Sequence, residues 1–169
     1  MLFGEKKEFA VEVSLNGDYG GAWLFGRICF WIGGAQIGAY QLGTSLRDLI
    51  PDLRRIVMDA GHRSINTSMS DEEVIDHIKR LSDEAPEDQE DFGKQLGVEM
   101  PAQLLIRMGV DVFDSWTIYL FDRRNYSRIT YWKSDSARDS IHQTLPRGYF
   151  DSVIREVFLH IDSLYEKET

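Results

Sequence analysis

A glycine-rich stretch between Gly20 and Tyr40 raises the question of a phosphate-binding loop. It reads GGAWLFGRICFWIGGAQIGAY and contains six glycines. A dinucleotide fingerprint requires G-x-G-x-x-G between a strand and a helix, and a P-loop ends in Gly-Lys-Ser/Thr. Neither spacing is present, and strand-like sequence follows Gly38. The pattern instead favours two strands joined by a tight turn, in which Gly33 and Gly34 supply the positive φ angles of a type I′ hairpin.

The histidines and the single cysteine are the next residues that could bind a metal or take part in catalysis. His62, His77, His142 and His160 form neither an i, i+4 pair nor an H-E-x-x-H motif, which are the spacings that identify metal sites. Cys29 lies in an apolar run, where a cysteine is usually a small buried hydrophobe. A lone cysteine excludes an internal disulfide and a thiolate zinc site. We therefore expect a non-enzymatic protein with no metal and no cofactor.

Acidic residues are concentrated in one segment. Of the formal charge of −9, the 21 residues from Asp71 to Asp91 carry −8, with ten acidic residues against two basic ones. Such a segment creates a local negative field, which attracts basic partners and repels nucleic acid. We expect no direct binding of nucleic acid, because phosphate contacts need clustered cations.

Two interpretations of this segment stay open. The first is a solvated helix face followed by a linker, which is what charge runs usually are. The second is a docking surface for a basic protein partner, in which the charges steer association. The residues proposed for partner binding are Asp71, Glu72, Asp83, Glu84, Glu87, Asp88, Glu90 and Asp91. A further alternative places the interface on aromatic residues of a predicted hairpin, namely Trp116, Tyr119, Tyr131 and Trp132, although such residues are more often sheet core.

Length and composition bound the class of protein. A chain of 169 residues with 43% hydrophobic residues is typical of one globular domain with a sizeable core. The first 13 residues carry charges where an export signal needs an apolar stretch. No apolar run approaches the roughly 18 to 20 residues that span a bilayer. We therefore expect a cytoplasmic protein that does not bind membranes, and the sequence leaves its oligomeric state open.

The first half of the chain predicts strands followed by helices. Residues 9–15 alternate apolar and polar side chains, which indicates a half-buried strand. A second strand is predicted over 22–32, and a third returns after the Gly-Gly turn. Apolar spacing predicts a helix over 46–57 with a kink or restart at Pro51. A second helix begins at Ser70, where Ser70 and Glu73 form a capping box, and runs to Leu81.

The second half returns to strands and closes on a helix. Residues 83–97 are polar, broken by Pro86 and rich in acids, and predict an exposed acidic loop. Residues 102–108 fit a strand or a short helix. Two β-branched and aromatic segments, 115–121 and 126–133, predict a hairpin. A long helix with an apolar stripe is predicted from about 148 to 167.

The order of these elements predicts the fold class. Strands, then helices, then strands and a last helix are typical of an α+β fold with an antiparallel sheet. We expect about five to six strands in hairpins, packed against three or more α-helices, in a single domain spanning residues 1–169.

Five segments of the chain resemble a known family. They read MLFGEKKEFAVEVSL, GGAWLFGRICFWIGGAQIG, GTSLRDLIPDLRRIV, VFDSWTIYLF and LPRGYFDSVI. Their apolar and glycine patterns are similar to those of the immunity protein 42 family of bacterial polymorphic toxin systems. The resemblance covers both ends of the chain and departs from the family pattern over about residues 64–100, which include the acidic segment.

The resemblance implies a small cytoplasmic protein that binds the C-terminal domain of a cognate toxin and neutralises it by occlusion. The resemblance implies no catalytic residues in this chain. A basic toxin, such as a nuclease, would best fit the charge of the acidic segment. The alternative class is a small ligand-binding module, or an enzyme, with its site between the sheet and the helices.

Overall fold

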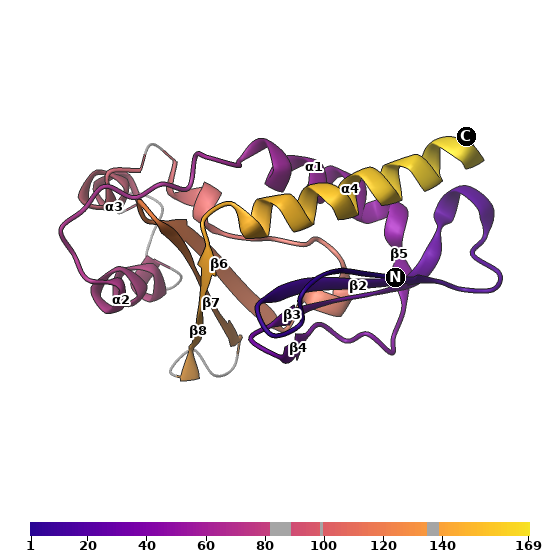
Figure 1. Cartoon of the computed structure of the whole chain (residues 1–169), viewed down its shortest axis with the longest axis horizontal. Helices are drawn as coiled ribbons and strands as arrows, with labels where there is room; N and C mark the ends of the chain where they lie inside the picture. The colour runs from indigo at the N-terminus through magenta and orange to yellow at the C-terminus, as the bar shows by residue number, and fades with distance from the viewer. Residues whose placement is uncertain (82–88, 99, 135–138) are drawn as a thin grey trace.

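The computed structural model describes residues 1–81, 89–98, 100–134 and 139–169. Within these residues the chain forms two antiparallel sheets and four α-helices, which confirms the α+β class. Figure 1 shows the two sheets side by side, with α4 (Tyr149–Glu168) running along both of them. None of the helices in the described residues is long and apolar enough to cross a membrane.

The N-terminal half forms the five-stranded sheet. Its strands are β1 (Leu2–Gly4), β2 (Phe9–Leu15), β3 (Phe25–Ile32), β4 (Ala35–Ile37) and β5 (Thr44–Ser45). The order is β1-β2-β3-β4, and β5 pairs with the start of β3. Gly33 and Gly34 adopt φ angles of +59° and +87° between β3 and β4, so the predicted Gly-Gly hairpin turn is confirmed.

The C-terminal half forms the three-stranded sheet. It contains β6 (Trp116–Asp122), β7 (Tyr126–Lys133) and β8 (Ile141–Pro146), in that order. The β6–β7 hairpin matches the prediction, whereas β8 was not predicted. Only Leu145 of β8 is buried, so this edge strand lacks the apolar alternation that identifies a strand.

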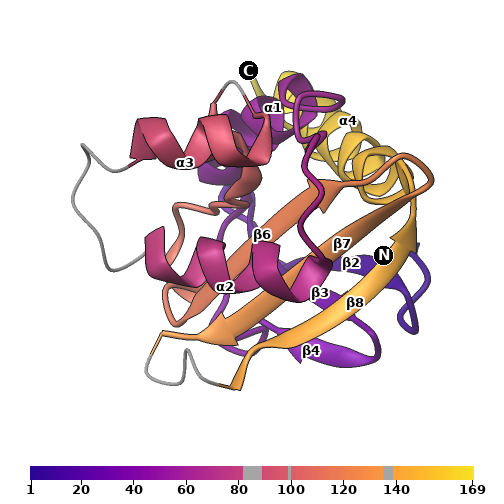
Figure 2. The ribbon, with the colours of Figure 1, turned by 90° about the vertical axis from the view of Figure 1, so that its left-hand side faces the viewer.

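The helices cover different faces of the sheets. The three that precede β6 are α1 (Ile50–Met58), α2 (Asp71–Leu81) and α3 (Gln89–Leu96). Helix α1 packs beside α4. Figure 2 shows α2 lying across the three-stranded sheet, on the opposite side from α1 and α4. The three-stranded sheet is therefore covered on both faces.

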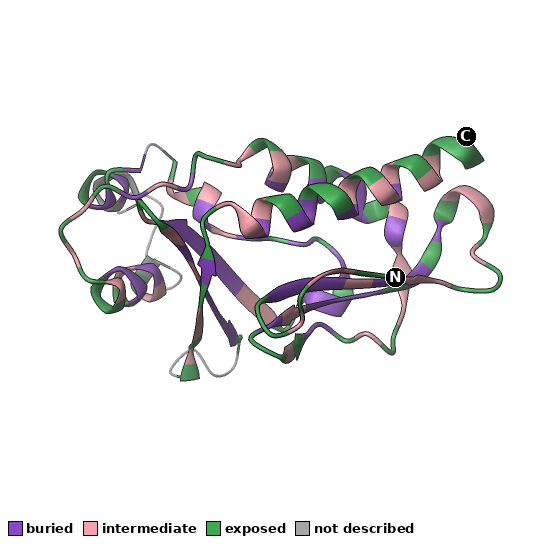
Figure 3. Cartoon of the chain, in the orientation of Figure 1, coloured by how far each residue is buried: buried purple, intermediate pink, exposed green. Residues whose placement is uncertain are grey.

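Side-chain alternation in β6 divides the interior into two clusters. Ile118 and Leu120 belong to the first core cluster, which includes residues of β2, β3, α1 and α4. Tyr119 and Phe121 belong to the second core cluster, beneath α2 and α3. Successive strand residues point to opposite faces, so β6 carries apolar side chains on both of its faces. Figure 3 shows β6 as an almost continuously buried strand.

The helix starts follow the sequence signals. The Ser70 N–H donates to Glu73 Oε2 at 2.7 Å, and the Glu73 N–H donates to Ser70 Oγ at 3.3 Å. This is the predicted capping box. The predicted helix over 46–57 is split into a 3₁₀ turn, Leu46–Leu49, and α1, with Pro51 in the first turn of α1. The predicted restart at Pro51 is confirmed.

The predicted acidic loop over 83–97 is wrong at its C-terminal end. Residues 83–88 lie outside the described residues, but Gln89–Leu96 forms helix α3. Leu96 is fully buried, and a Cβ at Gly93 would lie 2.9 Å from the Val98 carbonyl oxygen. Close packing against the following turn thus stabilises a helix whose local propensity is poor. Residues 101–104 form the short helical turn that was one of two alternatives for this stretch.

Candidate partner-binding site

Helix α2 presents an acidic face to solvent. Its apolar residues Val74, Ile75 and Ile78 are buried in the second core cluster. Because helical residues three and four apart share a face, the intervening residues face outward. Glu72, Glu73 and Asp76 are all exposed on this outer side. The first part of the acidic segment is therefore a solvated helix face, available to a partner.

Asp71 differs from its acidic neighbours, because both of its carboxylate oxygens have partners. Arg123 Nε donates to Oδ1 and the Tyr126 hydroxyl donates to Oδ2, each at 3.0 Å. Burial and the bond to Asp71 raise the pKa of Tyr126. Arg123 also donates to the backbone carbonyls of Thr67 and Met69. Asp71 thus fastens α2 to the β6–β7 hairpin, and its charge is largely compensated.

The arginine that fastens α2 lies in the turn between β6 and β7. Arg123 follows β6 directly and is only 16% exposed at its side chain. No local pattern marks this contact, because Arg123 and Asp71 are 52 residues apart in the chain. An arginine in a predicted turn, together with an acid at a predicted helix start, is the only sequence signal for such a pair.

The other predicted partner-binding residues are distributed unevenly. Glu72 lines a shallow polar groove between the start of α2 and β7, together with Ser70, Tyr126 and Arg128. Glu90 and Asp91 lie in helix α3. The remaining four, Asp83, Glu84, Glu87 and Asp88, lie outside the described residues.

The aromatic residues of the hairpin are mostly core. Tyr119, Tyr131 and Trp132 are each at most 8% exposed, and Tyr119 stacks on Trp132 with ring centroids 5.7 Å apart. A surface made of these three side chains is not available to a partner. Trp116 is half-buried and lies at the start of β6.

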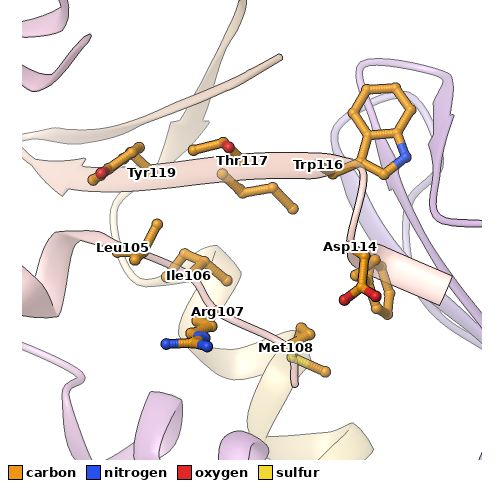
Figure 4. Close-up of a pocket in the computed structure, with 10 residues that line it drawn as sticks. Leu105, Ile106, Arg107, Met108, Asp114, Trp116, Thr117 and Tyr119 are labelled. Carbon is orange, nitrogen blue, oxygen red and sulfur yellow. The ribbon is translucent and has the colours of Figure 1, made fainter. Parts of the chain in front are cut away.

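A pocket beside β6 was not predicted. This β6 pocket has a volume of about 320 Å³ and lies between residues 105–108 and the first half of β6. Figure 4 shows the segment that carries Leu105 and Ile106 running alongside Thr117 of β6. Its floor includes the buried side chains of Ile106, Met108, Phe113 and Ile118. Its sequence signal is weak, because apolar residues in 104–108 also fit a core strand.

Charged groups flank the β6 pocket. Asp114 and Arg107 line it and are exposed. Within the described part of the chain, neither the Asp114 carboxylate nor the Arg107 guanidinium has a hydrogen-bond or ion-pair partner. An apolar floor with free charges at its mouth is suited to holding a side chain of another molecule.

Burial is the main cause of the shifted pKa values of Cys29, His142 and His160. Burial raises the pKa of the Cys29 thiol to about 12, and it lowers the pKa of His142 and of His160. None of these three residues lines the β6 pocket or the groove beside α2. The described residues contain no group of three or more His, Cys, Asp or Glu side chains arranged to hold a metal ion.

Comparisons with known proteins found a matching family and a similar solved structure. The model of a family described as immunity protein 42 matches residues 1–159, a range that includes residues 64–100, where we expected a departure. No curated protein matches the chain. Among solved structures, the crystal structure of CdiI from Burkholderia dolosa AUO158 is similar, with 18% sequence identity and a TM-score of 0.70. The alignment covers 95% of this chain and 99% of that one, so the two share a fold.

Proposed function

The chain belongs to the immunity protein 42 family, and from that premise we propose that it binds a cognate toxin domain and neutralises it by occlusion. The observation that carries the proposal is the match of the family over residues 1–159. The shared fold with a CdiI protein supports it. When bound, the chain would cover the active site of the toxin. Neutralisation would therefore need no catalysis by the chain itself.

We propose that the toxin domain is basic, as a nuclease would be. A chain of net charge −9 with −8 between residues 71 and 91 attracts a cationic surface from a distance. Complementary fields of this kind accelerate association and fix orientation more than they raise affinity. The protein would act in the cytoplasm, where a delivered nuclease reaches its substrate.

The proposed contact surface is the acidic segment. On α2 it includes Glu72, with Glu73 and Asp76 beside it on the exposed side of the helix. It continues through Asp83, Glu84, Glu87, Asp88, Glu90 and Asp91. Asp71 supports the surface by holding the start of α2 in place through Arg123.

Co-expression tests the function directly. The gene next to that of this chain is examined for a large exported protein, and its C-terminal domain is expressed with and without the chain. We expect the domain alone to stop growth, the chain to restore it, and the two to co-elute on a sizing column. Equal killing in both cultures, together with separate elution, would contradict the proposal.

A charge-reversal series tests the surface. Glu87, Asp88, Glu90 and Asp91 are changed to Lys together, and association with the toxin domain is measured at several salt concentrations. We expect slower association and a weaker dependence on salt. An unchanged rate at every salt concentration would dismiss the acidic segment and leave the toxin-binding function in place.

A further inference from the structure

The outer edge of β6 is only partly paired. The Ser134 N–H donates to the Ser115 carbonyl at 3.0 Å, so Ser115 faces β7. Because antiparallel residues alternate in direction, the backbone N–H and C=O of Trp116 and Ile118 face the outer edge. The Ile118 carbonyl accepts a bond from the Ile106 N–H at 2.9 Å. At Trp116, neither group has a partner among the described residues.

The chain that covers β6 turns away just before Trp116. Arg55 of α1 donates to the Arg107 carbonyl at 2.8 Å, and Asp52 of α1 accepts from the Gly109 N–H. Residues 107–109 are therefore held against α1 instead of β6. The β6 pocket is the space that this departure leaves, and the unpaired edge of Trp116 faces the same side of the strand. An unpaired strand edge beside a hollow can accept an extended segment of another protein.

The charge of the pocket mouth favours a basic side chain. Asp114 lines the pocket, and Asp111 is exposed one 3₁₀ turn before it. Arg107 is the only cation that lines the pocket among the described residues. A lysine or arginine would place its aliphatic stem on the apolar floor and its charge near Asp114, as long cationic side chains do at apolar surfaces. This preference matches the basic toxin proposed above.

The β6 pocket adjoins the layer that carries the acidic face. Leu105 and Tyr119 line the pocket, and both pack in the second core cluster beneath α2 and α3. The pocket therefore borders the layer of side chains that α2 and α3 cover.

We propose that the β6 pocket anchors an extended segment of the toxin domain. The backbone of that segment pairs with the N–H and C=O of Trp116, and one lysine or arginine enters the pocket toward Asp114. This inference rests on the proposed toxin-binding function and names the site at which the toxin is held after the acidic face has attracted it.

Two variants and one matched control test the anchor with purified protein and toxin domain. Asp114→Lys reverses the charge at the mouth, and Thr117→Trp fills the pocket from β6. Glu156→Lys makes the same charge change at an exposed position of α4, outside the pocket lining and outside the acidic segment. We expect the first two to raise Kd at least tenfold, mainly through faster dissociation, and the control to stay within threefold. Asp114→Asn serves if the reversed charge impairs folding, with an expected rise of about threefold or more.

Hydrogen exchange at the Trp116 amide tests the strand pairing directly, because a purely structural role of the pocket would not change this exchange rate on binding. The amide of Trp116 should exchange quickly in the free protein and become protected in the complex. An amide that stays unprotected in a formed complex would overturn the strand pairing. Binding of Asp114→Lys and Thr117→Trp within threefold of the wild type would overturn the anchor while the toxin-binding function stands. An equal loss of binding in Glu156→Lys would overturn it too. No binding by the wild-type chain would instead refute the proposed function itself.

Discussion

Arg63 and Asp151 form an ion pair of 2.7 Å that joins the loop after α1 to the first turn of α4. The arginine side chain is fully buried and the aspartate is 16% exposed. Arg63 also donates to the Ile56 carbonyl at 2.6 Å, which ties the end of α1 to the same point. Burial raises the pKa of Asp151, and Arg63 opposes that rise. The pair therefore couples the two helices that lie beside each other over the first core cluster.

Removal of one partner should be costly. We expect Arg63→Met to lower the free energy of unfolding by about 3 to 5 kcal/mol, because it leaves a buried carboxylate without its cation. Urea denaturation followed by circular dichroism measures the change. Arg54→Met is the control, since Arg54 is 60% exposed and lies 3.8 Å from Asp162; it should cost less than about 1 kcal/mol. A loss below about 1 kcal/mol for Arg63→Met would show that the pair contributes little.

Local sequence patterns predicted the elements whose signals are complete within a few residues. The alternation of residues 9–15, the Gly33-Gly34 turn and the Ser70–Glu73 capping box are each such a signal, and each is present in the structure. The exposed position of Glu72 followed from the helical period of α2 in the same way.

Local sequence patterns could not predict the contacts between segments that are far apart in the chain. Helix α3 depends on packing around Leu96 and Gly93, and β8 depends on pairing with β7. The contact between Arg123 and Asp71 joins residues that are 52 positions apart in the chain. The β6 pocket exists because Arg55 holds the backbone at Arg107 against α1. No residue spacing within one segment predicts these two features. They could be identified only from the three-dimensional structure.

Asp71 and Glu72 are adjacent but should affect different properties. We expect Asp71→Asn to lower the free energy of unfolding by about 1 to 3 kcal/mol, because it weakens charged bonds to Arg123 and Tyr126. Glu72→Gln should change the free energy of unfolding by less than about 1 kcal/mol, because it removes one exposed charge from the first turn of α2. It should instead slow association with the toxin domain at low salt, an effect that 1 M salt removes. Reversed roles for the two residues would contradict this division.

Cys29 should be inert in the folded protein. It is fully buried in β3, and burial raises the pKa of its thiol to about 12. The thiolate is the reactive form, so it is scarce at pH 8. We expect an aromatic disulfide reagent to label the native chain at least a hundredfold more slowly than the same chain in urea. Labelling at similar rates in both states would show that β3 opens readily to solvent.

His142 should make stability depend on pH near neutrality. Burial lowers the pKa of His142, whose Nδ1 lies 2.8 Å from Thr130 Oγ1. The unfolded chain then binds a proton at a higher pH than the folded chain does. Stability should fall as pH drops from about 6.5 toward the lowered pKa, and this histidine should cause no further loss below that value. His142→Gln should flatten the slope of the urea midpoint between pH 7.5 and 5.5. The difference between wild type and variant above pH 8, where the histidine is neutral in both states, reports packing alone and is the reference. An identical slope in the two proteins would show that protonation of His142 does not oppose folding.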